Sequence, residues 1–373
     1  MANNNKDAFQ DFYRGAAARL SKGLTAYNNT LTAETQVFLK PFMEAMADLN
    51  AGGKMLRGVL VNLGYRLAGH ADTAPSDGAA LAFEIFQTGV LIHDDIIDRA
   101  GQRRGKKTIP LRYEESLAGR GITPPAEKDT PARIAEGAAI CAGDYLIAAS
   151  SAEIARRYAG HPRLAEVLSY FQQVILDTVR GEMLDVVLPC EISDPALADD
   201  RRADILMTAV WDIYHLKTSR YSVLGPLHLG MLLGGMSPER MAAVDEAADD
   251  IGAAFQIKDD ILGVFADQAK LGKDVGSDIS EYKQTILYAY VRLFCPEAWQ
   301  ALSAIYGRAV ITEETLAEVR RILETSGAAA YAENEMARCF DRASSAVETM
   351  DFLTENDREL LRGLIGYMKK REK

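Results

Sequence analysis

The stretch that decides the fold of this chain reads Leu91-Ile92-His93-Asp94-Asp95-Ile96-Ile97-Asp98. The apolar residues of the run that leads into it are Leu81, Phe83, Ile85, Phe86, Val90 and Ile92. They spread around every side of a helical wheel, which predicts a buried helix over about residues 78–99. Carboxylates at the C-terminal end of such a helix are disfavoured by the helix dipole and by burial, so they need a cation. Asp94 and Asp98 share one helix face, and their oxygens suit Mg2+, which usually also binds a phosphate.

The overall composition narrows the class of protein. The chain has 373 residues, 48% of them hydrophobic, so it is long enough for a sizeable core. Its net charge of -11 argues against nucleic acid as a partner. The N-terminal residues hold no apolar run typical of a signal peptide, and no apolar segment approaches the roughly 18 residues of a membrane span. We therefore expect a cytoplasmic protein without a membrane span.

Helical periodicity runs through most of the chain. Apolar residues spaced three and four apart predict many helices, and alternating strand patterns are rare. The segment 100–131 is rich in glycine and proline and is expected to be loop with short helical pieces. There is no internal repeat and no low-complexity linker. The predicted fold class is all-α, with residues 1–373 in a single domain.

A second acidic cluster, Asp259-Asp260, lies near the end of the helix predicted over residues 238–265. Asp259 continues a stripe of apolar residues on one helix face, so we expect it to point inward. The members of this stripe are Val244, Ala248, Ile251 and Phe255. Two inward clusters can meet across a central cavity and bind shared metal ions, although a solvated helix face remains an alternative for either cluster alone.

Basic residues accompany both clusters. Lys54 and Arg57 lie three residues apart at a predicted helix start, where backbone N–H groups and the helix dipole favour an anion. Arg103 and Arg104 directly follow the first aspartates. Further basic residues near the clusters are Lys217, Lys258, Lys273 and Lys283. Each alone can be a solvated surface charge, but together they predict two anion sites beside metal ions, with diphosphates as ligands.

These motifs, in this order, resemble the trans-isoprenyl diphosphate synthases, which are head-to-tail prenyltransferases. The resemblance runs from Gly52 to Thr285 by motif and onward by helix pattern. The matching motifs are Gly53-Lys54-x-x-Arg57, Asp94-Asp95-x-x-Asp98, Arg103-Arg104-Gly105, Gly143-Asp144, Gly181-Glu182-x-x-Asp185, Lys217-Thr218, Phe255-Gln256-x-x-Asp259-Asp260, Gly272-Lys273 and Gly276-x-Asp278. It implies an isoprenoid-synthase-type helical bundle around a central cavity.

The resemblance also implies a role for each motif residue. Asp94 and Asp98 would hold two Mg2+ ions with Asp95 in support, and Asp259 would hold a third with Asp260 nearby. The allylic diphosphate would be bound by Arg103, Lys217 and Lys273. Isopentenyl diphosphate would be bound by Lys54, Arg57, Gln87 and Arg104. Thr218 and Gln256 would lie near the reacting carbons.

The implied reaction fits these residues. An allylic C–O bond ionises as charge develops on the leaving diphosphate, which cations in a water-poor site stabilise. The allylic cation needs surroundings without nucleophiles, which an apolar bundle supplies. No His or Glu stands out as a base, and in the family the departing diphosphate is thought to take the proton. His93 is adjacent to Asp94 but off its face, so we interpret it as structural.

Three positions depart from the family pattern. Gly263 stands where many members have Asp. Other members share the Asp-Asp-Ile-Leu-Gly form, so we interpret it as a subtype in which one implied ligand contact is left open. Gly58 stands where Pro is usual, with a local effect expected. Glu182 stands where Gln is usual, and we expect its partner to be a cation or a water.

Product length is expected to depend on the helix before Asp94. In the family, a bulky side chain about one turn before the first aspartate stops chain growth early. Here Gly89 and Val90 occupy that turn, and Phe86 lies one turn deeper. The growing chain is expected to extend into a cavity beside this helix. If Gly89 leaves the cavity open and Phe86 closes it one turn deeper, the product is geranylgeranyl diphosphate (C20), with C25 or longer, or C15, as alternatives.

Two other functions remain as alternatives. A terpene cyclase would carry Asn or Asp, Ser or Thr, and Glu at spaced positions in its second motif, and none is found on the corresponding helix. A non-catalytic partner subunit would typically lack the aspartate motifs, which this chain keeps. A homodimer is expected by family analogy alone.

Overall fold

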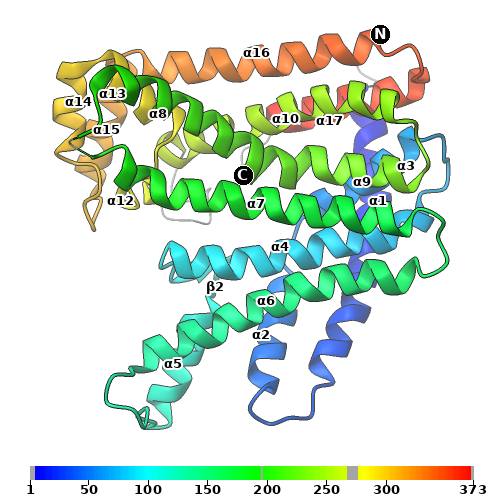
Figure 1. Ribbon diagram of the computed structural model, residues 1–373, viewed down its shortest axis with the longest axis horizontal. Helices are drawn as coiled ribbons and strands as arrows, with labels where there is room; N and C mark the ends of the chain where they lie inside the picture. Colours follow the sequence, from blue (N-terminus) through cyan, green and yellow to red (C-terminus); the bar gives the residue numbers. More distant parts are fainter. Residues whose placement is uncertain (1–4, 195, 267–275, 371–373) are drawn as a thin grey trace. The chain divides into compact units, whose positions relative to one another are not determined.

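The computed structural model describes residues 5–194, 196–266 and 276–370 and confirms the predicted all-α class (Figure 1). In the first half of the chain the helices are α1 (Asn5–Thr32), α2 (Lys40–Asn50), α3 (Leu56–Leu67), η1 (Ala74–Ser76), α4 (Asp77–Ile97), α5 (Ile109–Gly119), α6 (Pro131–Arg157) and α7 (Leu164–Glu191). In the second half they are α8 (Asp199–Ile213), η2 (Tyr214–Leu224), α9 (Gly225–Leu233), α10 (Pro238–Phe265), α12 (Ser277–Ser280), α13 (Ile286–Phe294), α14 (Pro296–Ser303), α15 (Glu313–Thr325), α16 (Ala328–Thr349) and α17 (Glu355–Lys370). The described strands, β1 (Gln102–Arg103) and β2 (Lys106–Lys107), form one antiparallel hairpin.

The chain divides into two compact units, each with its own aspartate cluster. The α4 unit comprises Asp11–Ser169 and Leu229–Gly235. The α10 unit comprises Met1–Gln10, Tyr170–His228 and Met236–Lys373.

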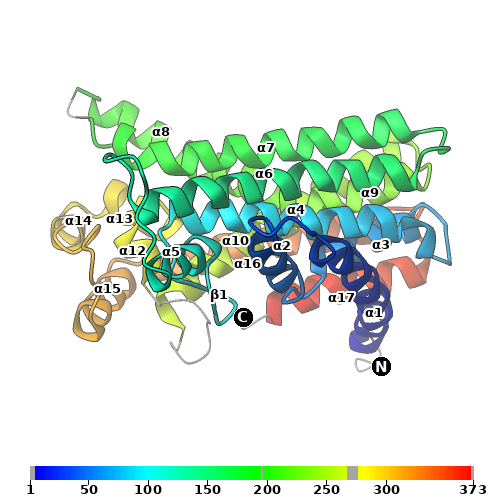
Figure 2. The same cartoon turned by 90° about the horizontal axis from the view of Figure 1, so that it is seen from below.

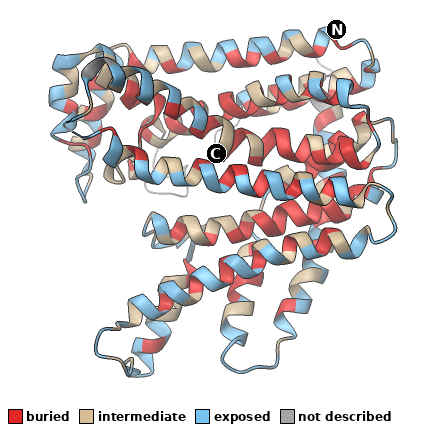
Figure 3. Ribbon diagram, viewed as in Figure 1, coloured by how far each residue is buried: buried red, intermediate tan, exposed pale blue. Residues whose placement is uncertain are grey.

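Within the α4 unit, α4 is the central buried helix. It packs against α6 and α3, and α4 and α6 lie side by side (Figures 1 and 2). Phe83, Ile85 and Phe86 have no exposed surface, and buried residues dominate α4 in Figure 3. The buried helix predicted around residues 78–99 is therefore confirmed.

The contact between α4 and α6 corrects the interpretation of Gly89. A Cβ atom built on Gly89 would lie 2.9 Å from the Gly143 carbonyl oxygen and 2.9 Å from Ile147 Cγ1. The space beside Gly89 is filled by α6. Gly89 therefore permits close helix packing and does not leave room there for a growing product chain. Phe86 is fully buried and Val90 is half-buried.

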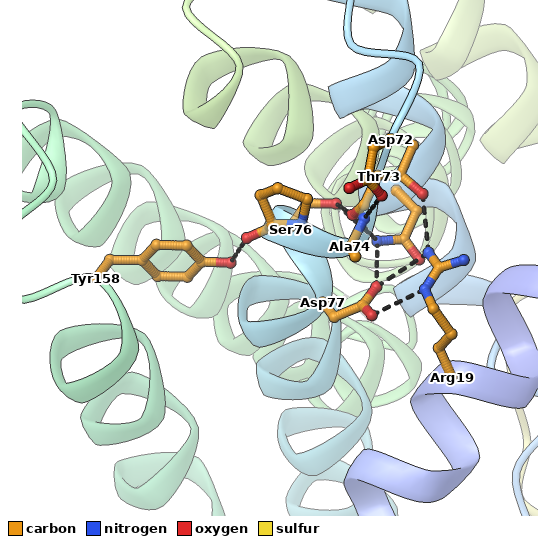
Figure 4. A network of polar contacts seen from close by, with 9 residues as sticks. Arg19, Asp72, Thr73, Ala74, Ser76, Asp77 and Tyr158 are labelled. Carbon is orange, nitrogen blue, oxygen red and sulfur yellow. Dashed lines mark hydrogen bonds and ion pairs between the residues drawn. The ribbon is translucent and has the colours of Figure 1, made fainter.

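A polar network anchors the N-terminal end of α4 (Figure 4). Arg19 Nε of α1 donates to Asp77 Oδ2 at 2.9 Å, and its Nη2 donates to Thr73 Oγ1 at 2.8 Å. Tyr158, just after α6, donates from its hydroxyl to the Pro75 carbonyl at 2.9 Å. Asp77 lies in the first turn of α4, where a negative charge complements the helix dipole. These hydrogen bonds link the start of α4 to α1 and to the residue that follows α6.

Within the α10 unit, α10 packs against α16 and η2. The surrounding core includes residues of α8, α13, α14 and α15, with fully buried members Val210, Leu287, Leu302, Val319 and Leu323. The helix predicted over residues 238–265 coincides with α10. The helices α13 and α14 meet at Cys295, where Pro296 follows and ends the first of them.

Among the described helices, α6 alone is long and apolar enough to cross a membrane by length and composition. One such helix is weak evidence, because core helices of soluble proteins pass the same test. Its exposed apolar residues are Ile134, Ile140 and Tyr145. The absence of a membrane span stays a prediction.

Candidate active site

The C-terminal end of α4 holds Asp94 and Asp95 against Arg103 of β1. Arg103 Nη2 lies 2.6 Å from Asp94 Oδ2, and Arg103 Nε donates to Asp95 Oδ1 at 2.6 Å. Asp95 is 2% exposed, whereas Asp94 and Asp98 are half-buried. Burial lowers the pKa of Arg103, but Asp94 and Asp95 more than offset this, and the pKa lies above its usual value. The first cluster is thus already paired with an internal cation.

This cation, Arg103, is positioned by the β1–β2 hairpin. Arg103 pairs with Lys106 across the hairpin, and Arg104 (φ 54°) and Gly105 (φ 73°) form the turn in left-handed conformations. Glycine adopts this conformation readily, whereas for arginine it is uncommon and is often found at functional sites. Arg104 Nη1 donates to the Leu49 carbonyl at 2.6 Å, which binds the turn to the end of α2.

Three of the residues predicted for isopentenyl diphosphate, Lys54, Arg57 and Arg104, lie around the start of α3. A Cβ atom on Gly52 would lie 2.9 Å from Arg104 Cδ, so the missing side chain lets Arg104 approach the loop before α3. Gln87 is half-buried on α4. The loop before α3 and the hairpin turn therefore contribute cations to one locality.

Glu84 lies among these cations and escapes prediction from the sequence. It is 4% exposed and accepts a hydrogen bond from Gly58 N at 2.8 Å. Burial raises its pKa, and this is partly offset by the backbone hydrogen bond from Gly58 and by the nearby charges of Arg57 and Arg104. The backbone N–H groups expected to be free at the start of α3 are thus partly occupied by this carboxylate. The available signal was a single acidic residue in the apolar run 79–86.

In the second cluster Asp260 is more buried than Asp259. Asp260 is 3% exposed and accepts hydrogen bonds from the Tyr214 hydroxyl and from Gln256 Nε2, the latter at 2.8 Å. Burial raises the pKa of Asp260 well above its usual value, and the negative charge of Asp278 adds to this. Asp259 is half-buried. Neutral donors, rather than a guanidinium, therefore hold the deeper carboxylate of this cluster.

Asp278 occupies the space left at Gly263. A Cβ atom on Gly263 would lie 2.9 Å from Asp278 Oδ2. The missing side chain at the third motif position is thus matched by a carboxylate from α12, which follows α10 in the chain. An acidic group stands beside this turn of α10 despite the glycine.

Lys217 and Thr218 lie on η2, an 11-residue π-helix. Lys217 Nζ lies 2.8 Å from Glu182 Oε2 and 2.6 Å from Asp185 Oδ2 of α7. Thr218 Oγ1 donates to Gln256 Oε1 at 2.6 Å. A cation partner for Glu182 is therefore confirmed. π-Helical segments occur frequently at functional sites, and this one brings both predicted residues toward motif residues of the α10 unit.

Two further residues considered in the sequence analysis are Lys273 and His93. Lys273, predicted for the allylic diphosphate, lies outside the described residues. His93 Nε2 lies 3.0 Å from the Ile140 carbonyl oxygen of α6, a contact that suits the structural role expected for this ring.

The donor set of the first cluster fits Mg2+. Within the described ranges, no group of three or more His, Cys, Asp or Glu side chains is placed to hold a metal by itself. Mg2+ in phosphate-binding sites needs no such cage, because waters and substrate phosphates complete one or two carboxylates. Asp94 and Asp98 offer only oxygen ligands at a half-buried helix end. These residues therefore suit a magnesium ion that shares its coordination with a phosphate.

Comparisons with known proteins agree with this chemistry. The family model "Polyprenyl synthetase" matches residues 40–323. The chain is 29% identical over 326 residues to a short chain isoprenyl diphosphate synthase of Methanothermobacter thermautotrophicus, covering 87% of this chain and 88% of the relative. It is 28% identical over 339 residues to a geranylfarnesyl diphosphate synthase of Aeropyrum pernix, covering 87% and 92%.

A solved structure shows the same fold. It is a geranylgeranyl pyrophosphate synthase from Corynebacterium glutamicum complexed with isoprenyl diphosphate and magnesium. It is 26% identical, covers 97% of this chain and 99% of its own, and superposes with a TM-score of 0.82. The chain therefore belongs to the polyprenyl synthetase family and is a prenyltransferase that makes polyprenyl diphosphates.

Proposed function

We propose that this enzyme condenses isopentenyl diphosphate head-to-tail with an allylic diphosphate of five to fifteen carbons, with geranylgeranyl diphosphate as the main product. The observation that carries the proposal is the pairing of Arg103 with Asp94 and Asp95 at the end of a buried helix. A cation and two carboxylates in contact form a site that can exchange its internal ion pair for a metal-bound diphosphate.

Binding of the allylic substrate follows from the aspartates. We propose that Asp94 and Asp98 hold two Mg2+ ions, with Asp95 orienting Arg103, and that Asp259 holds a third, with Asp260 in support. When bound, Mg2+ stabilises the negative charge that develops on the leaving diphosphate. Other proposed diphosphate contacts are Arg103, Lys217 and Lys273.

The reaction then balances without a dedicated protein base. The allylic C–O bond breaks and its electron pair goes to the diphosphate. The alkene of isopentenyl diphosphate forms the new C–C bond, and the proton lost from it passes to the departing diphosphate. Thr218 and Gln256, which are hydrogen-bonded to each other, are proposed to lie near the reacting carbons and to keep water away from the cation.

Product length is proposed from Phe86, which is fully buried on α4 two turns before Asp94. A rigid aromatic side chain along this helix would stop growth near C20. Gly89 does not contribute open space, since α6 covers it. C25 or longer products, and C15, are the alternatives, and the relatives' own names range from short chain through geranylfarnesyl to heptaprenyl and octaprenyl diphosphate synthase.

One assay tests the function. Purified protein with Mg2+, labelled isopentenyl diphosphate and a C5, C10 or C15 allylic partner should yield an elongated diphosphate, with C20 as the main product by chromatography. A cyclic hydrocarbon would instead identify a terpene cyclase. Turnover only after addition of a second chain would identify a partner subunit.

We also propose that the enzyme is a cytoplasmic homodimer without nucleic-acid partners. The supporting observation is an exposed apolar face on α7 within the α10 unit, formed by Leu176, Val179, Met183, Val186 and Val187. Apolar patches of this kind commonly mark subunit interfaces. Light scattering should give twice the monomer mass of 40.8 kDa, and Met183→Glu should lower it. We propose that residues 1–373 act as one catalytic domain, since one family model matches residues 40–323.

A further inference from the structure

Glu84 is a buried carboxylate for which the reaction scheme has no role. It lies on α4 with 4% of its surface exposed, next to fully buried apolar neighbours. A buried charge is costly unless hydrogen bonds and opposite charges compensate it. Glu84 shares a face of α4 with Gln87, Asp94 and Asp98, because these positions are spaced three, seven and four apart. It therefore stands on the face of α4 that carries the proposed substrate residues.

Glu84 caps a helix that lacks a cap of its own. The residue before α3, Met55, is left-handed (φ 58°) and makes no side-chain capping hydrogen bond. A capping group normally accepts from the second or third backbone N–H of a helix. Glu84 Oε1 accepts from the third, Gly58 N, at 2.8 Å, and the Arg57 N–H also bonds to this carboxylate. The first turn of α3, which carries Arg57, is thus held by a side chain of α4.

The same carboxylate faces the cations of the proposed isopentenyl diphosphate site. A Cβ atom on Gly53 would lie 3.5 Å from Glu84 Oε2 and 3.5 Å from Arg104 Nη2, so these two atoms flank one glycine. The charges of Arg57 and Arg104 both act on Glu84 and oppose the effect of burial on its pKa. Two elements distant in sequence, the start of α3 and the β1–β2 turn, are therefore oriented by one anion.

Gly58 makes this arrangement possible in this chain. Proline, usual in the resembling proteins at this position, has no N–H and could not donate to Glu84. A side chain here would also force its neighbours to shift, because a Cβ atom on Gly58 would lie 2.7 Å from Leu20 Cδ1 and 3.0 Å from the Ala80 carbonyl oxygen. Glycine here supplies both the donor and the space.

We propose that Glu84 is a positioning residue of the isopentenyl diphosphate site, which holds the first turn of α3 and the guanidinium groups of Arg57 and Arg104 ready for the diphosphate. This inference rests on the proposed function. Glu84 does not touch the substrate. Its role is to pre-order two cations, so that less freedom is lost when isopentenyl diphosphate binds.

The test is Glu84→Gln, which keeps the size of the side chain and one acceptor oxygen but removes the charge. We expect KM for isopentenyl diphosphate to rise about tenfold, while kcat and KM for the allylic diphosphate change less than about twofold. Glu84→Asp, which restores the charge on a shorter side chain, should recover part of the affinity. The matched control is Glu153→Gln, which neutralises another buried glutamate paired with two arginines of the α4 unit, Arg156 and Arg157, and should leave both KM values unchanged.

Two outcomes would overturn the inference. One is an unchanged KM for isopentenyl diphosphate in a folded Glu84→Gln protein. The other is an equal fall in activity toward both substrates that follows the folded fraction measured by circular dichroism, which would make Glu84 merely structural. Failure of the proposed function looks different, because wild-type protein would then fail to condense the two diphosphates at all.

Discussion

The two aspartate clusters differ in what holds their carboxylates. At the end of α4, Asp94 and Asp95 are bound by the guanidinium of Arg103, at 2.6 Å each. On α10, Asp260 is bound by the neutral Tyr214 hydroxyl and the Gln256 amide. Charged hydrogen bonds are stronger but can be exchanged for a metal and a phosphate. At Asp260, burial favours the uncharged form of the acid, and the hydrogen bonds from its two neutral donors offset this only in part. We infer that the α4 cluster is built for exchange and that Asp260 mainly supports its neighbour.

The largest effect is therefore expected at the α4 cluster. Asp94→Asn should lower kcat/KM by about a thousandfold, roughly 4 kcal/mol of transition-state stabilisation, because Mg2+ loses a carboxylate ligand. Steady-state kinetics with both diphosphates would measure it, with circular dichroism as the check on folding. A folded variant that keeps more than a tenth of the activity would contradict metal binding by Asp94.

A smaller effect should separate the two aspartates of α10. Asp259→Asn should lower kcat/KM by about a hundredfold, because it removes a proposed metal ligand. Asp260→Asn should cost about tenfold or less, since burial raises the pKa of Asp260 and an amide can still accept from the Tyr214 hydroxyl. Equal losses at both positions, or the reverse order, would show that Asp260 is itself the ligand.

The comparison also shows what the sequence could predict. The all-α class and the buried α4 follow from periodicity, because a helix repeats every 3.6 residues and its faces can be read directly. The roles predicted for the motif residues come instead from the resemblance to the family. The sequence could not predict that Gly89 is covered, because the covering helix is α6, which approaches α4 closely at Gly143. Glu84 escaped for the same reason: its partners come from α3 and a hairpin turn that are distant in sequence.

Gly263 and Asp278 provide a third test of how the α10 cluster is built. If the Asp278 carboxylate replaces the missing aspartate, Asp278→Ser should lower kcat/KM about tenfold. Gly263→Asp alone should also be harmful, since its side chain would meet Asp278 Oδ2. The double variant Gly263→Asp/Asp278→Ser should regain most of the activity in the same kinetic assay. A double variant as poor as the two losses multiplied would rule out this replacement.

The smallest effect on rate is expected at Phe86, which lies on α4 away from the aspartates. Phe86→Ala should lengthen the products by one or more five-carbon units, with kcat changed by less than about threefold, because the metal ligands are untouched. The loss of a buried ring should also lower stability, by about 3–5 kcal/mol. Chromatography of products made from labelled isopentenyl diphosphate is the measurement, and unchanged lengths would remove Phe86 as the stop.

Gly89→Phe, which family analogy would use to shorten the products, is not a clean companion variant. Its side chain would collide with Gly143 and Ile147 of α6, so we expect misfolding before any change of product. Thermal unfolding of this variant should show the loss of stability directly.

The most direct test of the account is calorimetric titration of the protein with geranyl diphosphate alone, with Mg2+ and with a chelator. We expect binding that requires Mg2+ in the wild type and is weakened at least about a hundredfold in Asp94→Asn, because the aspartates reach the diphosphate only through the metal. Equal affinity with the chelator, or an unchanged affinity in a folded Asp94→Asn protein, would contradict the assignment of the α4 cluster as a magnesium–diphosphate site.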